Sequence, residues 1–360
     1  MLADIKELQS LSQSFQGNEK LKKESFQYLS ELGKGSFGKV YKVSSVSTRI
    51  LYAMKILSKD QLNTLKMVSQ LKNEIALLAR CNHPNIIRLH TAFEDKDSIY
   101  LVMELATGGT LFHELKREGK FSEAQTASYM ADIVRAIHYL HSLKPCVLHR
   151  DLKPENVLIC NGTLKLADFG WSNTSNNCRN TFCGTPDYLC PEMILGTGHN
   201  EKLDIWTLGV LMYELLHGKP PFAPQDRSID RRLQQKITEE NILAGKVVFD
   251  NGVSVEAREA IRAKLRPDPR HRPEACELFN LEFYKKHGKV LKLSESGSRN
   301  SNRNIAEGER KKIEALEVEL LKTRHIATEL AHKCQAQKVK MGKLEQEKQQ
   351  YLSEIQKLVR

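Results

Sequence analysis

The sequence HRDLKPEN at residues 149–156, followed twelve residues later by DFG at residues 168–170, decides how this chain is interpreted. Phosphoryl transfer depends on positioning and charge neutralisation more than on covalent chemistry. The first motif offers a carboxylate and an ammonium two residues apart, which can serve these two purposes. Asp151 would accept the proton of an attacking hydroxyl group, and Lys153 would lie near the transferring phosphoryl group. Either motif alone can be a chance turn, but together and in this order they predict a phosphotransfer site.

Two further side chains of these motifs are candidate metal ligands. Asn156 ends the first motif, and Asp168 begins the second. Mg²⁺ is a hard cation that prefers a few carboxylate or amide oxygens together with phosphate oxygens. We therefore predict that Asn156 and Asp168 bind Mg²⁺ together with ATP.

Upstream of these motifs, a glycine-rich stretch has the spacing Gly-x-Gly-x-x-Gly. Glycines let backbone amides close over phosphate oxygens because no Cβ intervenes. Dinucleotide-binding turns share this spacing but open a helix, whereas residues 40–43 (VYKV) continue here as an alternating strand. We therefore predict that the stretch covers the phosphates of ATP. Its residues are Leu32, Gly33, Lys34, Gly35, Ser36, Phe37, Gly38, Lys39 and Val40.

A lysine and a glutamate complete the predicted catalytic set. Lys55 lies in the strand-like segment 51–56, and Glu74 follows 19 residues later in a helix predicted over residues 69–80. A lone lysine in a strand is usually a solvated charge. With a carboxylate partner on the following helix, Lys55 can instead be held against the α- and β-phosphates.

These motifs, in this order, resemble those of a eukaryotic protein kinase domain over residues 26–287. The resemblance implies an α+β fold of two lobes. Residues 26–103 would form a small β-rich N-lobe with one key helix, residues 104–107 the hinge, and residues 108–287 a larger helical C-lobe. Lys153 is typical of the serine/threonine branch, so the implied reaction moves the γ-phosphate of ATP to Ser or Thr.

Within the kinases, the sequence is similar to the Aurora family. DFGWS at residues 168–172 is the distinguishing feature, and residues 55–62 and 199–206 support the same assignment. By this resemblance Thr181 is the regulatory phosphosite. A phosphate there adds about −1.5 to −2 charges, and Arg150 beside the catalytic aspartate is the natural partner. The alternative is that Thr181 is simply a polar loop residue.

Other positions follow or depart from this pattern. Glu192 and Arg272 match positions that usually form a buried ion pair in the kinases. Cys190 stands where the Aurora family usually has proline, Pro186 replaces the usual leucine, and the segment 223–248 is longer than usual. These departures concern regulation rather than catalysis.

The resemblance also implies an adenine site between the lobes. Apolar side chains would sandwich the flat base, and the hinge backbone would bind its edge. The same side chains could equally be ordinary core. The expected walls are Leu32, Val40, Ala53 and Leu158, and the expected hinge residues are Met103, Glu104 and Ala106.

Glu155 has the acidic character needed to recognise an arginine near the phosphoacceptor of a protein substrate. The Arg179-x-Thr181 sequence fits such a preference and makes autophosphorylation plausible. We also assign Glu155 to the nucleotide site. The alternative is a salt bridge within the fold.

The net charge of +11 over 360 residues does not identify a partner. Residues 291–360 hold 15 basic and 10 acidic side chains, so the excess is spread along the chain. The sequence therefore predicts neither nucleic-acid binding nor, with no long apolar run, a membrane span. Eight cysteines show no CxxC pair, which favours reduced thiols in the cytoplasm or nucleus.

The ends of the chain have a different character. Residues 1–25 are a short polar extension, and residues 288–305 read as a linker rich in Ser and Asn. In residues 306–360, most a and d positions of seven heptads counted from Ile313 are apolar, which favours a coiled coil. The tail would form a homodimer or bind a partner helix, and a solvated single helix is the alternative.

The Aurora resemblance implies a role in mitosis, a spindle or centrosome scaffold or a microtubule-associated activator as partner, and a location on the cytoskeleton. Two alternatives stay open at this point. One is a coiled-coil scaffold with a vestigial kinase fold, and the other is a different basophilic serine/threonine kinase. The intact catalytic residues argue against the scaffold.

Overall fold

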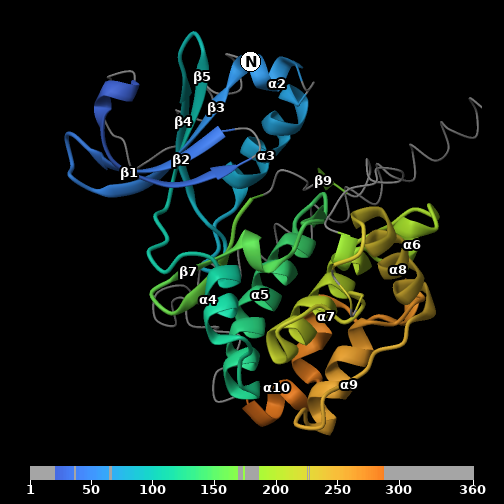
Figure 1. Cartoon of the computed structure of the whole chain (residues 1–360). Coiled ribbons are helices and arrows are strands. Elements are labelled where there is room, and N and C mark those ends of the chain that lie inside the picture. The colour runs from blue at the N-terminus through green and yellow to red at the C-terminus, as the bar shows by residue number, and fades with distance from the viewer. Residues whose placement is uncertain are drawn as a thin grey trace, which may run out of the picture. The chain divides into compact units, whose positions relative to one another are not determined.

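The computed structural model describes residues 21–35, 38–64, 67–168, 173–174, 186–224, 226 and 228–287. Within these residues, strands dominate the first part of the chain and helices the second (Figure 1). No helix in the described part is long and apolar enough to cross a membrane. The predicted linker and coiled coil, residues 288–360, lie outside it.

The upper lobe is built on an antiparallel sheet with the order β1-β2-β3-β5-β4. Lys55 lies in its central strand, opposite Val40 on one neighbour and Leu101 on the other. The expected alternating segments therefore do form strands. Their bounds are β1 (Phe26–Gly35), β2 (Gly38–Ser45), β3 (Leu51–Ser58), β4 (Leu89–Glu94) and β5 (Ser98–Met103).

Alternation along the strands gives this sheet two apolar faces. One face packs Leu57 and Leu101 against Leu71 and Ile75 of α3 (Val68–Arg80), the helix predicted to begin one residue later. The other face is an aromatic cluster that includes Phe93 of β4. The sequence did not predict the short helix α2 (Lys59–Thr64) that joins β3 to α3.

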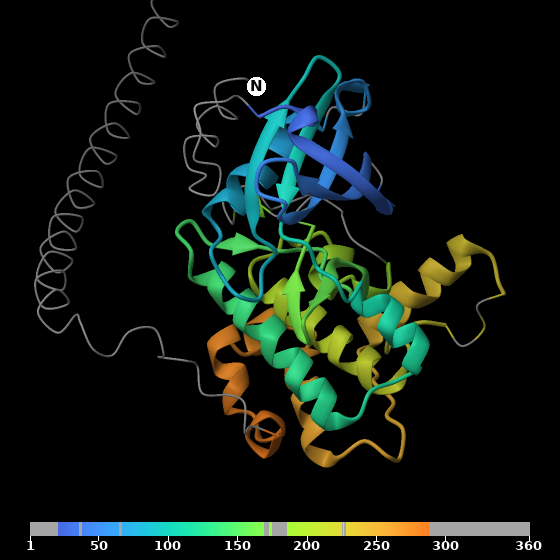
Figure 2. The ribbon, with the colours of Figure 1, turned by 90° about the vertical axis from the view of Figure 1, so that its left-hand side faces the viewer.

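The lower lobe is helical and surrounds α7 (Lys202–His217), in which most side chains are buried. α5 (Glu123–Ser142) lies beside α7 in the lobe (Figures 1 and 2). Ser122 caps the N-terminus of α5, since its Oγ accepts a hydrogen bond from the amide of Gln125 at 3.2 Å. The remaining helices are α4 (Leu111–Glu118), α6 (Pro191–Ile194), α8 (Arg231–Ala244), α9 (Val255–Lys264) and α10 (Glu282–His287).

Two small two-stranded sheets flank the catalytic motifs at the top of this lobe. β7 (Val157–Cys160) and β8 (Thr163–Leu166) are joined by Asn161 and Gly162, both with positive φ, as a two-residue type I′ turn requires. β6 (Val147–Leu148) pairs with β9 (Asn173–Thr174). HRDLKPEN thus links β6 to β7, and Asp168 follows β8.

Short 3-10 helices complete the described residues. They are η1 (Lys23–Ser25), η2 (Pro154–Asn156), η4 (Pro186–Tyr188), η5 (Pro269–His271) and η6 (Ala275–Asn280).

Candidate active site

Lys55, Glu74 and Asp168 meet from three separate elements: β3, α3 and the segment after β8. The Lys55 Nζ lies 3.3 Å from Glu74 Oε1 and 3.6 Å from Asp168 Oδ1. The predicted lysine–glutamate pair is therefore present, and it bridges to the aspartate of DFG.

The electrostatics of this cluster keep Lys55 charged. Burial would lower the pKa of Lys55, but the Glu74 and Asp168 carboxylates outweigh it, so the pKa is raised and the ammonium stays charged. Two carboxylates then share one cation. Glu74 is buried, whereas the side chain of Asp168 is 53% exposed.

The catalytic loop brings Asp151, Lys153 and Asn156 together. The Lys153 Nζ lies 3.0 Å from Asp151 Oδ1 and 2.9 Å from Oδ2. The Asn156 Nδ2 donates to the Asp151 backbone oxygen at 2.7 Å and to its Oδ2 at 2.8 Å. Because the nitrogen of the Asn156 amide is committed to Asp151, its Oδ1 is the atom with lone pairs for a metal ion. The structure thus brings together three of the residues predicted as catalytic.

Asp204 of α7 holds this loop, and the sequence had not identified that role. Its carboxylate accepts hydrogen bonds from the backbone amides of His149 and Arg150, both at 2.9 Å, and lies 2.8 Å from His141 Nε2. Burial would raise the pKa of Asp204, but these hydrogen bonds and the charge of His141 keep it low. Arg150 has a φ of 69°, a strained value for a residue with a side chain. The carboxylate therefore stabilises a loop conformation that the chain would not adopt alone.

The loop is also tied to the segment that joins β8 to Asp168. The Ala167 amide donates to the Asn156 carbonyl at 2.9 Å. His149 is fully buried, and burial lowers its pKa despite the charges of Asp204, Asp151 and Asp168 nearby. Hence the two motifs share one neighbourhood.

The expected adenine site lies where β1, β2, β3 and β7 approach the hinge. Ala53 is buried, and Val40 and Leu158 are half-buried, whereas Leu32 is 48% exposed. Met103 ends β5 and packs against the α3 side of the sheet. The Glu104 amide donates to the Arg88 carbonyl at 2.9 Å, so the carbonyl of Glu104 and the backbone of Ala106 are the hinge groups expected to meet the base.

Part of the glycine-rich stretch is also described. β1 continues through Lys34 to Gly35, which pairs with Gly38, so these glycines belong to a hairpin rather than to a separate loop. A Cβ at Gly38 would lie 1.8 Å from the carbonyl oxygen of Ile56, which is why β2 can approach β3 here only with glycine. At Gly33 a Cβ would meet nothing within 4 Å. Lys39 forms an exposed ion pair with Glu31 at 2.9 Å.

Some predicted residues lie outside the described part of the chain: Ser36, Phe37, Phe169, Gly170 and Thr181. Arg150, the expected partner of a phosphate on Thr181, is buried. Glu155 is exposed in η2, next to Asn156.

Comparison with known proteins agrees with this geometry. The family model described as "Protein kinase domain" matches residues 26–284. Aurora/IPL1-related protein kinase 2 of Caenorhabditis briggsae is 40% identical over 278 residues, which are 77% of this chain and 87% of the relative. The protein of the same name from Caenorhabditis elegans is 43% identical over 243 residues, 67% and 76% of the two chains.

The chain belongs to the Aurora family of serine/threonine protein kinases. Aurora kinase A-A of Xenopus laevis is 41% identical over 251 residues, which are 69% of this chain and 59% of the relative. This chain therefore spans about three fifths of the length of that frog Aurora kinase.

The buried ion pair expected from the kinase resemblance is present. Arg272 donates to Glu192 at 2.6 Å and 2.8 Å, and its guanidinium lies 4.9 Å from the centre of the Trp206 ring. Cys190 caps α6 at the start of this region and is completely buried. The cysteine is thus accommodated in the core at the position where Aurora kinases usually have proline.

Kinases use ATP with a divalent metal ion, and the residues here fit both. A carboxylate at Asp168 and an amide oxygen at Asn156 are the donors that Mg²⁺ prefers when phosphates supply further ligands. Lys55 is a half-buried ammonium that stays charged, as phosphate binding requires. The Asp168 side chain is 53% exposed, so its carboxylate is accessible, and together with the Asn156 amide oxygen this donor set suits a metal–nucleotide complex.

Proposed function

We propose that this protein transfers the γ-phosphate of ATP to Ser or Thr residues of proteins, with Mg²⁺ as the metal ion. The observation that carries the proposal is the contact of Lys55 with both Glu74 and Asp168. Three elements far apart in sequence supply the lysine, its partner and the metal ligand, which supports an assembled phosphotransfer site.

Each residue of the catalytic loop has a defined task in this proposal. Asp151 accepts the proton of the attacking hydroxyl group, and its carboxylate is oriented by Asn156 at 2.8 Å. Lys153, 2.9 Å from the same carboxylate, neutralises negative charge beside the transferred group. Bound Mg²⁺ would offset the phosphate charge from Asn156 and Asp168, while Lys55 holds the other phosphates.

We propose that the substrate carries an arginine near its phosphoacceptor. Tyr188 donates a hydrogen bond to Glu214 of α7. Burial raises the pKa of Tyr188, and the charges of Glu214 and Glu155 add to the effect. Asp187 contributes in the same direction. Glu155 is exposed in η2, directly before Asn156 of the catalytic loop, and an exposed carboxylate at this place favours a guanidinium from the substrate.

Regulation by Thr181 and targeting by the tail are further parts of the proposal. A phosphate on Thr181 would attract Arg150, whose backbone is fixed by Asp204 and adjoins Asp151. We propose that residues 306–360 form a homodimer or bind a partner helix, as the heptad pattern suggests, and that the protein acts at spindle or centrosome structures in mitosis, as the family assignment suggests.

Kinetic comparison of the full-length protein with Asp151→Asn tests the function. We expect ATP-dependent phosphorylation of a serine peptide with arginine two residues before it, and a loss of at least about a hundredfold in kcat for the variant. An exposed carboxylate in the β4–β5 turn provides the matched control, Asp97→Asn, which should behave as the unaltered protein. Equal rates for the protein and Asp151→Asn would refute the proposed function.

A further inference from the structure

The side chain of Glu104, the first residue of the hinge, joins three segments of the fold. Its Oε1 lies 2.9 Å and its Oε2 3.0 Å from the Nζ of Lys165 in β8. Its Oε2 also lies 3.4 Å from the amide of Arg88, just before β4. The exposed fractions of the Lys165 and Glu104 side chains are only 14% and 27%. Both oxygens of the Glu104 carboxylate therefore bind Lys165 of β8, in an ion pair that is largely shielded from solvent.

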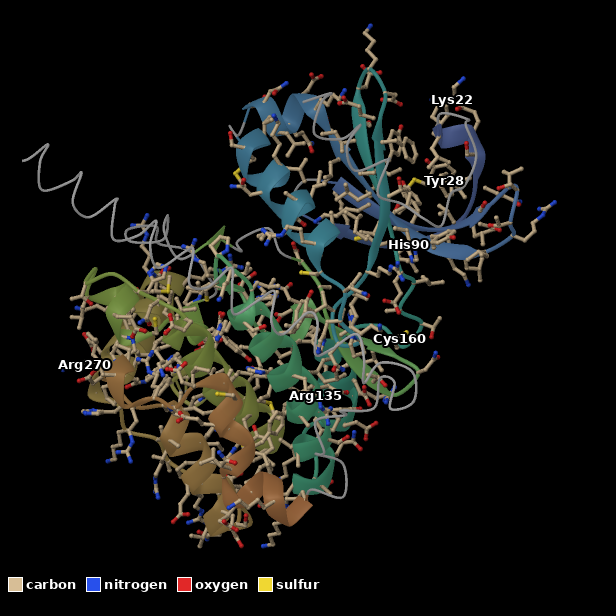
Figure 3. All side chains as sticks on the ribbon, turned by 180° about the vertical axis from the view of Figure 1, so that it is seen from behind. Lys22, Tyr28, His90, Arg135, Cys160 and Arg270 are labelled. Carbon is tan, nitrogen blue, oxygen red and sulfur yellow. The ribbon has the colours of Figure 1, made fainter. Side chains whose placement is uncertain are left out.

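The ion pair lies on the same face of the β7–β8 hairpin as the expected adenine wall. Leu158 is directly opposite Lys165 in the antiparallel register, and side chains of opposed residues share a face. Cys160, two residues after Leu158, is on that face too, and its Sγ lies 3.9 Å from Glu104 Oε1. In Figure 3, Cys160 of the lower lobe lies below His90 of the upper lobe. The hinge thus rests against the strands that carry Leu158.

Backbone hydrogen bonds fix both ends of the hinge. At its start the Glu104 amide donates to the Arg88 carbonyl at 2.9 Å. At its end the Gly108 amide donates to the carbonyl of Ile159 in β7, and the Ile159 amide donates to the carbonyl of Gly109, each at 2.9 Å. The carbonyl of Glu104 and the backbone of Ala106 lie between these points. Their position relative to Leu158 is therefore sensitive to the Glu104 side chain.

We propose that Lys165 is a positioning residue for the adenine base. Through its ion pair with Glu104, Lys165 fixes the distance between the hinge backbone and Leu158, and so the space in which the base binds. This inference rests on the proposed use of ATP. The same strand, β8, leads directly to Asp168, so the ion pair also sets the hinge relative to the metal ligand. Lys165 does not touch the nucleotide in this account.

Equilibrium binding of adenosine to the full-length protein tests the inference, because adenosine lacks the phosphates that Lys55 and the metal ion would bind. We expect Lys165→Gln and Glu104→Gln each to weaken adenosine binding about fivefold, as expected for a shielded ion pair. The double variant should be no weaker than either single variant, since both remove the same interaction. Lys165→Arg, which keeps the charge, should restore most of the affinity.

Two additional measurements separate positioning from a general effect on the fold. In phosphorylation assays, Lys165→Gln should raise KM for ATP by the same factor as the adenosine Kd, with the effect in KM rather than kcat. The control is Lys286→Gln, which removes a 2.9 Å ion pair with Glu256 on the far side of the lower lobe and should leave adenosine binding unaltered. Additive losses in the double variant, or an unaltered adenosine Kd in Lys165→Gln, would overturn the inference. Failure of the proposed function would instead appear as absent phosphate transfer in the unaltered protein, while the adenosine comparison would still decide this inference.

Discussion

A lysine in the core of the lower lobe provides a quantitative test of the structure. Lys264 ends α9 and is completely buried. Its Nζ donates to the Ala260 carbonyl at 2.9 Å, lies 3.5 Å from Met212 Sδ, and lies 5.2 Å from the centre of the Tyr284 ring. Within the described residues, no carboxylate forms an ion pair with this ammonium. Replacement with methionine, Lys264→Met, should therefore stabilise the protein.

The size of the effect follows from the pKa. Burial lowers the pKa of Lys264 from 10.5 to about 7. Between these two pH values the unfolded chain binds a proton that the folded protein does not. The buried lysine therefore lowers the free energy of unfolding, and this cost becomes smaller as the pH rises. The cost is about 4 kcal/mol at pH 7.5 and about 1.5 kcal/mol at pH 9.5. Subtracting about 1 kcal/mol for the lost hydrogen bond leaves a gain of about 3 kcal/mol for Lys264→Met at pH 7.5.

Urea unfolding at several pH values measures this gain. Trp206 is fully buried and stacked on Phe222 at 5.5 Å, so its fluorescence reports the unfolding of the lower lobe. Burial also raises the pKa of Cys81, to about 11, and such groups weaken the fold as pH rises. The variant and the unaltered protein share these groups, so the difference between their free energies of unfolding isolates Lys264.

The expected difference shrinks from about 3 kcal/mol at pH 7.5 to less than about 1 kcal/mol at pH 9.5. A variant that is less stable than the unaltered protein at pH 7.5 would refute the reasoning. A difference that does not change with pH would refute it as well, because it would trace any gain to packing rather than to the charge.

Three further predictions concern the ion pair in the core, the anchor of the catalytic loop and the active-site lysine. Glu192→Ala should lower the free energy of unfolding by about 3–5 kcal/mol, since it leaves the Arg272 guanidinium buried without its carboxylate. Urea unfolding measures this loss, and a value below about 1 kcal/mol would contradict the prediction. Asp204→Asn should lower kcat at least about tenfold and leave the adenosine Kd unaltered, because the loop amides lose a charged acceptor. Kinetics and adenosine titration measure the two quantities, and a change confined to adenosine binding would count against the prediction. Lys55→Met should lower kcat at least about a hundredfold in the same peptide assay, and retention of full activity would show that Lys55 has no part in phosphate binding.

The sequence predicted the parts of the site that are encoded in short motifs. Asp151, Lys153 and Asn156 all lie within residues 151–156, so their proximity follows from local structure. The pairing of Lys55 with Glu74 was also predicted, because a strand followed by a helix on one face of a sheet brings the two side chains together.

The sequence could not predict contacts that depend on how distant elements pack. Asp204 reaches the amide of His149 across 55 positions, and Lys165 reaches Glu104 across 61. Their residue types are common on protein surfaces, and nothing local distinguishes them from solvated charges. The burial of Lys264 is a similar case, since a lysine at the end of a helix is ordinarily exposed.

Phosphosite mapping tests the central claim most directly. The full-length protein is incubated with ATP and Mg²⁺, in parallel with Asp151→Asn, and modified residues are identified by mass spectrometry. The account predicts phosphate on Thr181 and on serines or threonines preceded by arginine in the unaltered protein, and none in the variant. Identical phosphorylation of both proteins, or none in either, would contradict the assignment of Asp151 and its neighbours as a phosphotransfer site.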